Sequence, residues 1–150
     1  MGINLDPMTA QLATQLAIAA VLGGVLGIER RFRRKPAGLR TYALVSMGSC
    51  LFVVLSLFGL GDFQYASSLD PSRVLSQIIV GVGFLGAGII FQSREEVHGL
   101  TTAAGLWVTA GIGAAVGLGL YELAAITTVI SLLIFFVLFF FESKIPQDGH

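Results

Sequence analysis

Long apolar stretches separated by short polar breaks recur along the chain. Each is close to the ~20 residues that a helix needs to cross a bilayer. The pattern predicts an all-α, polytopic membrane helix bundle that forms a single transmembrane domain over residues 1–150. The fourth stretch holds three threonines and four glycines, which leaves open a four-span alternative with a re-entrant hairpin. The expected spans are 9–28, 41–60, 72–91, 101–118 and 123–141.

Composition supports a lipid environment. Hydrophobic residues make up 55% of the 150 residues and charged residues 12%, whereas a soluble domain carries about a quarter charged residues. A single cysteine, Cys50, makes neither an internal disulfide nor a zinc site on its own. Two histidines offer no credible catalytic triad or dyad. We therefore expect no enzymatic activity and no cofactor.

The basic residues predict the orientation of the chain. Six of the nine lie between the first two spans, and Lys and Arg accumulate in cytoplasmic loops. Five spans then place the N-terminus outside and the C-terminus inside. We interpret most of this cluster as a topological anchor that contacts lipid headgroups, because no second basic surface accompanies it for binding a nucleic acid. The anchor residues are Arg30, Arg31, Arg33, Arg34 and Lys35.

The chain also repeats itself weakly at an offset of 61 residues. Gly27 aligns with Gly88, and the Gly-Leu dipeptide at Gly38 aligns with that at Gly99. The echo predicts a parallel repeat of two helix pairs about a pseudo-two-fold axis along the membrane normal, as in some transporters. Chance similarity in a chain rich in glycine and alanine is the alternative.

Small residues predict the packing faces, because helices in lipid associate through close backbone approach. Spans one and four carry them at intervals of four, facing either each other or a second subunit. A G-x-G-x-x-G pattern in span three lacks the strand and the acidic residue of a dinucleotide site, so we assign its glycines to packing as well. The last span has no glycine, which predicts a lipid-facing helix. The packing glycines are Gly23, Gly27, Gly81, Gly83, Gly86, Gly88, Gly105, Gly113 and Gly117.

Polar candidates lie at both ends of the bundle. Asp70 and Pro71 are typical of a helix start, and Arg73 and Gln77 share a helical face with Gly81. A charge near the membrane interior usually faces a cavity, which is one interpretation of Arg73. The alternative, to which we give equal weight, is that Arg73 extends to the outer interface and pairs with Asp70 or Asp62.

At the cytoplasmic face, Glu29 and Arg40 either pair across the loop mouth or are ordinary interfacial charges. A carboxylate there is also a possible contact for Mg²⁺, which binds one or two carboxylates and retains water.

Several ordered motifs carry a family resemblance. They are Gly24-x-x-Gly27-x-Glu29-Arg30, Ala37-Gly38-Leu39-Arg40-Thr41, Asp70-Pro71-Ser72-Arg73, the run from Gly81 to Gly88, and Gly99-Leu100-Thr101-Thr102-Ala103-Ala104-x-Leu106-Trp107. Over about residues 9 to 140 the chain resembles the MgtC/SapB family of bacterial inner-membrane proteins. It resembles the membrane domain alone, without the soluble C-terminal domain of MgtC itself. The functional residues that the resemblance implies are Glu29, Arg40, Asp70, Arg73 and Gln77.

The resemblance implies a multi-pass inner-membrane protein linked to magnesium homeostasis, stress adaptation and, in pathogens, virulence. It also suggests ATP synthase as a membrane partner. We expect a homo-oligomer, with a dimer favoured. Two hypotheses follow: a membrane regulator that acts through helix contacts, and an ion transporter or channel component for magnesium or a proton-coupled cation, with a polar path between helix pairs. No span carries a central carboxylate, which favours the regulator.

Overall fold

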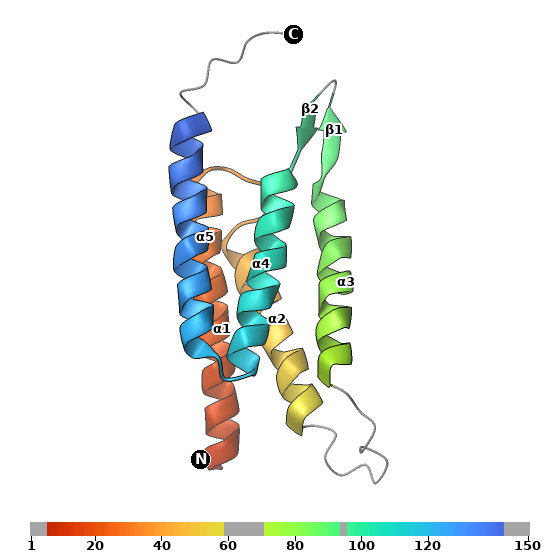
Figure 1. The fold of residues 1–150 in the computed structure, drawn as a ribbon, viewed down its shortest axis with the longest axis vertical. Helices are drawn as coiled ribbons and strands as arrows, with labels where there is room; N and C mark the ends of the chain where they lie inside the picture. Colours follow the sequence, from red (N-terminus) through yellow and green to blue (C-terminus); the bar gives the residue numbers. More distant parts are fainter. Residues whose placement is uncertain (1–5, 59–70, 94–95, 143–150) are drawn as a thin grey trace, which may run out of the picture.

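The computed structural model describes residues 6–58, 71–93 and 96–142. Within these ranges the chain forms five helices and one two-stranded antiparallel hairpin, which confirms the all-α membrane bundle (Figure 1). The helices are α1 (Pro7–Phe32), α2 (Leu39–Phe58), α3 (Pro71–Ile89), α4 (Leu100–Gly117) and α5 (Tyr121–Glu142), and the strands are β1 (Phe91–Ser93) and β2 (Glu96–His98).

Helices α1 to α4 are each long and apolar enough to cross a membrane, and α5 is apolar over Tyr121–Val137. The chain is a multi-pass membrane protein. Helix α4 is a continuous helix of 18 residues, so it does not form the re-entrant hairpin. Helix α1 continues to Phe32 instead of ending near residue 28, because polar side chains lower the hydropathy of a segment without breaking its backbone hydrogen bonds.

Successive helices run in opposite directions (Figure 1). The α1–α2 connection, the β-hairpin and the end of α5 lie at one end of the bundle, and the α4–α5 turn lies at the other. The pairs α1–α2 and α3–α4 are therefore two antiparallel pairs in the same orientation, as the internal echo predicts. The second connection is a hairpin rather than an open loop, and the Phe91 and His98 rings stack with centroids 5.2 Å apart. The pseudo-two-fold axis stays a prediction.

Helix α2 packs between α1 and α4, with glycines on both sides. A Cβ atom added at Gly23 of α1 would lie 2.6 Å from the Ser46 Cβ, and one added at Gly113 of α4 would lie 1.9 Å from the Ser46 carbonyl oxygen. The two small-residue stripes therefore meet the same helix within one chain. The predicted packing is confirmed at Gly23, Gly27, Gly86, Gly105, Gly113 and Gly117.

Three glycines of α3 have no packing contact with the described residues of this chain, so their predicted packing stays a prediction. A Cβ atom at Gly81, Gly83 or Gly88 would meet nothing within 4 Å. Helix α3 contacts the bundle along a narrow strip that includes the buried Val82 and Gly86, so a span rich in glycine on several faces leaves most of them uncovered. Only 11% of the α3 span is buried, against 56% of the α4 span.

Helix α5 is not wholly lipid-facing either. Ala124, Thr128, Ser131 and Phe135 form a buried strip along it. The two hydroxyls donate to carbonyl oxygens one turn earlier, Thr128 to Ala124 at 2.9 Å and Ser131 to Thr127 at 2.7 Å. Small side chains whose hydroxyl groups are hydrogen-bonded within their own helix can pack closely, as glycine does. The absence of glycine from α5 therefore did not mean that the whole helix faces lipid.

Candidate functional site

A cluster of buried charged side chains lies at the C-terminal end of α1. Glu29 and Arg30 are each 4% exposed. The Arg30 Nε donates to Glu29 Oε2, and the Arg33 Nε donates to Glu29 Oε1 at 3.2 Å. Both oxygens of the carboxylate therefore have a guanidinium partner, which is the condition for burying a charge at acceptable cost.

Two aromatic rings of α5 cover the two guanidinium groups. The Arg30 Cζ lies 3.7 Å from the centroid of Phe135, and the Arg33 Cζ lies 5.8 Å from the centroid of Phe136. Two cations face a single carboxylate, and the negative faces of the rings stabilise the excess positive charge, by about 2 kcal/mol for a desolvated pair. The cluster thus links the end of α1 to α5.

This geometry changes the assignment of the basic residues. Arg30 is buried, so its interpretation as a lipid-headgroup contact is wrong, whereas Arg33 is only partly buried and its headgroup contact stays a prediction. The remaining members of the anchor, Arg31, Arg34 and Lys35, are exposed as expected.

The expected pair of Glu29 with Arg40 does not form. Because α1 extends past Glu29, the carboxylate lies inside the bundle and within reach of Arg33 one turn later. Arg40 is exposed in the first turn of α2 and lines a separate cavity. With both oxygens of Glu29 occupied by arginines, this carboxylate is not available to Mg²⁺ in the observed arrangement.

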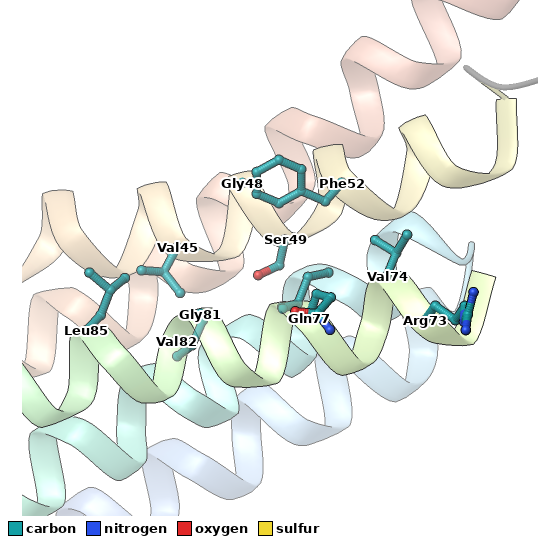
Figure 2. A pocket seen from close by; sticks show the side chains of 11 residues that line it. Val45, Gly48, Ser49, Phe52, Arg73, Val74, Gln77, Gly81, Val82 and Leu85 are labelled. Atoms are coloured by element: carbon teal, nitrogen blue, oxygen red, sulfur yellow. The ribbon is translucent and has the colours of Figure 1, made fainter. Parts of the chain in front are cut away.

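The second candidate region is an open groove of about 670 Å³ between α2 and α3 (Figure 2). Arg73 lies at its end near the start of α3, and Gln77 and Gly81 follow it along the same face, which confirms the predicted face. Ser49 contributes a polar group from α2. The rest of the lining is mainly apolar: Val45, Phe52, Val74, Ile78, Val82 and Leu85.

The predicted site residues do not converge. Glu29 and Arg40 belong to the end of the bundle with the α1–α2 connection, and Arg73 and Gln77 to the end where α3 begins (Figure 1). Asp70 and Asp62, the expected partners of Arg73, lie outside the described residues, although α3 begins at Pro71 as predicted. Among the residues described, no group of three or more His, Cys, Asp or Glu side chains is placed to hold a metal ion.

Sequence reasoning missed the Arg30 and Phe135 contact. A signal was present, because Arg30 follows Gly27 by three residues and so continues the packing stripe of Ala19 and Gly23. No comparable signal identified Phe135 among the neighbouring phenylalanines of α5.

Comparisons with known proteins place the chain in a family. The model of the MgtC family matches residues 16–144. The chain belongs to the MgtC family. One similar protein is named putative magnesium transporter YhiD and comes from Escherichia coli. It is 46% identical over 129 residues, which cover 85% of this chain and 60% of that protein.

Two further relatives have different names. Protein MgtC from Brucella abortus is 49% identical over 120 residues, which cover 80% of this chain and 48% of that protein. Protein SrpB from Synechococcus elongatus is 43% identical over 130 residues, which cover 81% of this chain and 71% of that protein. The chain thus spans 48% to 71% of the length of these three relatives. No solved structure matches.

Proposed function

We propose that this chain is a regulator in the bacterial inner membrane, linked to magnesium homeostasis and stress adaptation, that acts by docking a partner helix on the open face of α2 and α3. Membership of the MgtC family supports the magnesium link, as does the similarity to a protein named putative magnesium transporter YhiD. The proposal assigns no catalytic reaction to the chain.

The observation that carries the proposal is the open groove between α2 and α3. Glycines lie on both of its walls, and a Cβ atom at Gly48 or Gly81 would meet nothing within 4 Å. Glycine in a helix interior costs about 0.5–1 kcal/mol relative to alanine, and in lipid it is favoured where another backbone approaches closely. Uncovered glycines on a groove therefore favour a helix as its occupant.

We propose a second copy of this chain as the first occupant, which gives a homodimer through α3. The exposed face of α3 continues beyond the groove to Phe84, 80% exposed, and to the uncovered Gly88. A large ring beside a small residue can interdigitate with the same pair on a second helix. ATP synthase is the other partner that the family resemblance suggests.

A transporter is the alternative, and Arg73, Gln77 and Ser49 in the groove favour it. A cation path needs oxygen ligands placed along its length. The groove walls between these residues are mainly apolar, and the buried carboxylate Glu29 is held by two arginines at the other end of the bundle. These contacts support the regulator over the carrier.

Cross-linking tests the docking face. In a Cys50→Ala background, which removes the single native thiol, we expect Phe84→Cys to form a cross-linked dimer in native membranes. The matched control is Val129→Cys, an exposed position of α5, which we expect to remain monomeric. Equal cross-linking at both positions, or none at Phe84→Cys, would count against the α3 dimer.

Ion flux separates the two functions. Liposomes that contain the purified protein and a magnesium-sensitive dye should show no more magnesium entry than protein-free liposomes that contain the same dye. Magnesium entry that Arg73→Ala or Gln77→Ala abolishes would replace the regulator with the transporter.

A further inference from the structure

A second cavity, of about 560 Å³, opens at the α1–α2 connection and is lined by four cations. Arg31, Arg34 and Lys35 come from the end of α1 and the turn after it, and Arg40 comes from the first turn of α2. All four side chains are exposed. The remaining lining residues are Gly38, Leu39 and Thr41.

Among the described side chains, none that lines this cavity is acidic. Glu29 is the one acidic residue in the sequence between Asp6 and Asp62. Its two oxygens accept hydrogen bonds from Arg30 and Arg33, so the buried cluster uses the carboxylate and separates it from the cavity. The first turn of α2 also carries no acidic residue, and its positive helix end adds to the potential.

The backbone of the connection holds the cations around the opening. Arg34 has a positive φ of 54°, a conformation that is uncommon for a residue with a side chain. The Arg34 and Lys35 amides donate to the carbonyl oxygens of Arg31 and Arg30, both at 3.0 Å. The chain thus folds back on the end of α1 before α2 begins, which places Arg40 opposite the α1 cations.

We propose that this cavity binds the phosphate group of an anionic phospholipid headgroup. Guanidinium groups form paired, charge-assisted hydrogen bonds with phosphate. The cavity lies at an end of the helix bundle, where headgroups meet spanning helices, and Leu39 on its lining, which is 37% exposed, offers apolar surface for the lipid's glycerol and first methylene groups. Inorganic phosphate has the same charge but cannot use that surface. The inference does not depend on the proposed regulatory function.

Thermal unfolding of the full chain in a neutral detergent tests the site. We expect short-chain phosphatidylglycerol to raise the melting temperature in a saturable way, and phosphatidylcholine of the same chain length to have little effect. The double variant Lys35→Gln/Arg40→Gln should bind phosphatidylglycerol roughly tenfold to thirtyfold more weakly, since each basic residue near an anionic headgroup contributes about a factor of five.

Two control variants separate the site from general charge effects. Arg73→Gln removes one cation from the opposite end of the bundle and should keep the wild-type response. Lys35→Arg/Arg40→Lys preserves the charge of the cavity and should also keep it. An equal response to phosphatidylcholine, an unchanged response in Lys35→Gln/Arg40→Gln, or an equal response to inorganic phosphate alone would each overturn the assignment to a phospholipid headgroup.

Discussion

Ser46 occupies the tightest point of the bundle, with Gly23 on one side and Gly113 on the other. Because an added Cβ atom at Gly113 would lie 1.9 Å from a backbone carbonyl oxygen, the helices must move apart to accept it. We predict that Gly113→Ala destabilises the protein by about 1–3 kcal/mol, the usual cost of overpacking. Reversible denaturation in mixed detergent micelles measures the change.

Gly81→Ala is the matched control for this prediction. The substitution is chemically identical and also lies within a helix, but the new methyl group meets nothing within 4 Å. In dilute monomer, where no partner helix lies on the groove, we expect stability equal to or slightly above that of the wild type, because alanine has the higher helix propensity. Comparable losses in both variants would show that the steric account of Gly113 is wrong.

The charges of the buried cluster depend on one another. Glu29→Gln leaves Arg30 buried without its counter-ion, and we predict a loss of about 3–5 kcal/mol, as is typical when one partner of a buried pair is removed. The double variant Glu29→Gln/Arg30→Met removes both charges and should recover much of that stability. A double-mutant cycle in the same denaturation assay measures the coupling, and strictly additive losses would contradict it.

At the scale of whole elements, α3 stands apart from the other helices. Its span is 11% buried, whereas that of α4 is 56% buried and packs against Tyr42, Ser46 and Val53 of α2. Few buried contacts mean a low free energy of local opening. We predict that α3 amides exchange with deuterium at least tenfold faster than α4 amides in detergent, as measured by mass spectrometry of peptides. Equal protection of the two helices in dilute monomer would contradict the prediction.

The element scale also shows what the sequence can predict. Hydropathy identified all five helices, since a bilayer allows few alternatives to apolar helices. Spacing of small residues identified Gly23 and Gly113 as packing positions, because helical periodicity fixes a face. It did not reveal which helix each face meets, and Gly81 and Gly88 meet none within the described part of this chain. The partners of Glu29 could not be predicted, because they depend on where α1 ends and hydropathy locates helix ends poorly.

At the scale of the whole molecule, the arrangement of the ends agrees with the orientation that the basic residues predict. The α1–α2 connection, which carries Arg31, and the β-hairpin, which carries Ser93, lie at the same end, and the α4–α5 turn near Leu120 lies at the other (Figure 1). If the first end is cytoplasmic, as the excess of Lys and Arg predicts, the two sets of positions must differ in their access from outside the cell.

Thiol labelling of intact cells measures that difference. In a Cys50→Ala background, we predict that a membrane-impermeant maleimide labels Leu120→Cys, and that it labels Arg31→Cys and Ser93→Cys only after the membrane is permeabilised. All three native side chains are exposed, so access should depend on the bilayer rather than on packing. Labelling of Arg31→Cys but not Ser93→Cys from outside would contradict the arrangement of the helices itself. Labelling of both from outside, with Leu120→Cys protected, would keep the fold and invert its orientation.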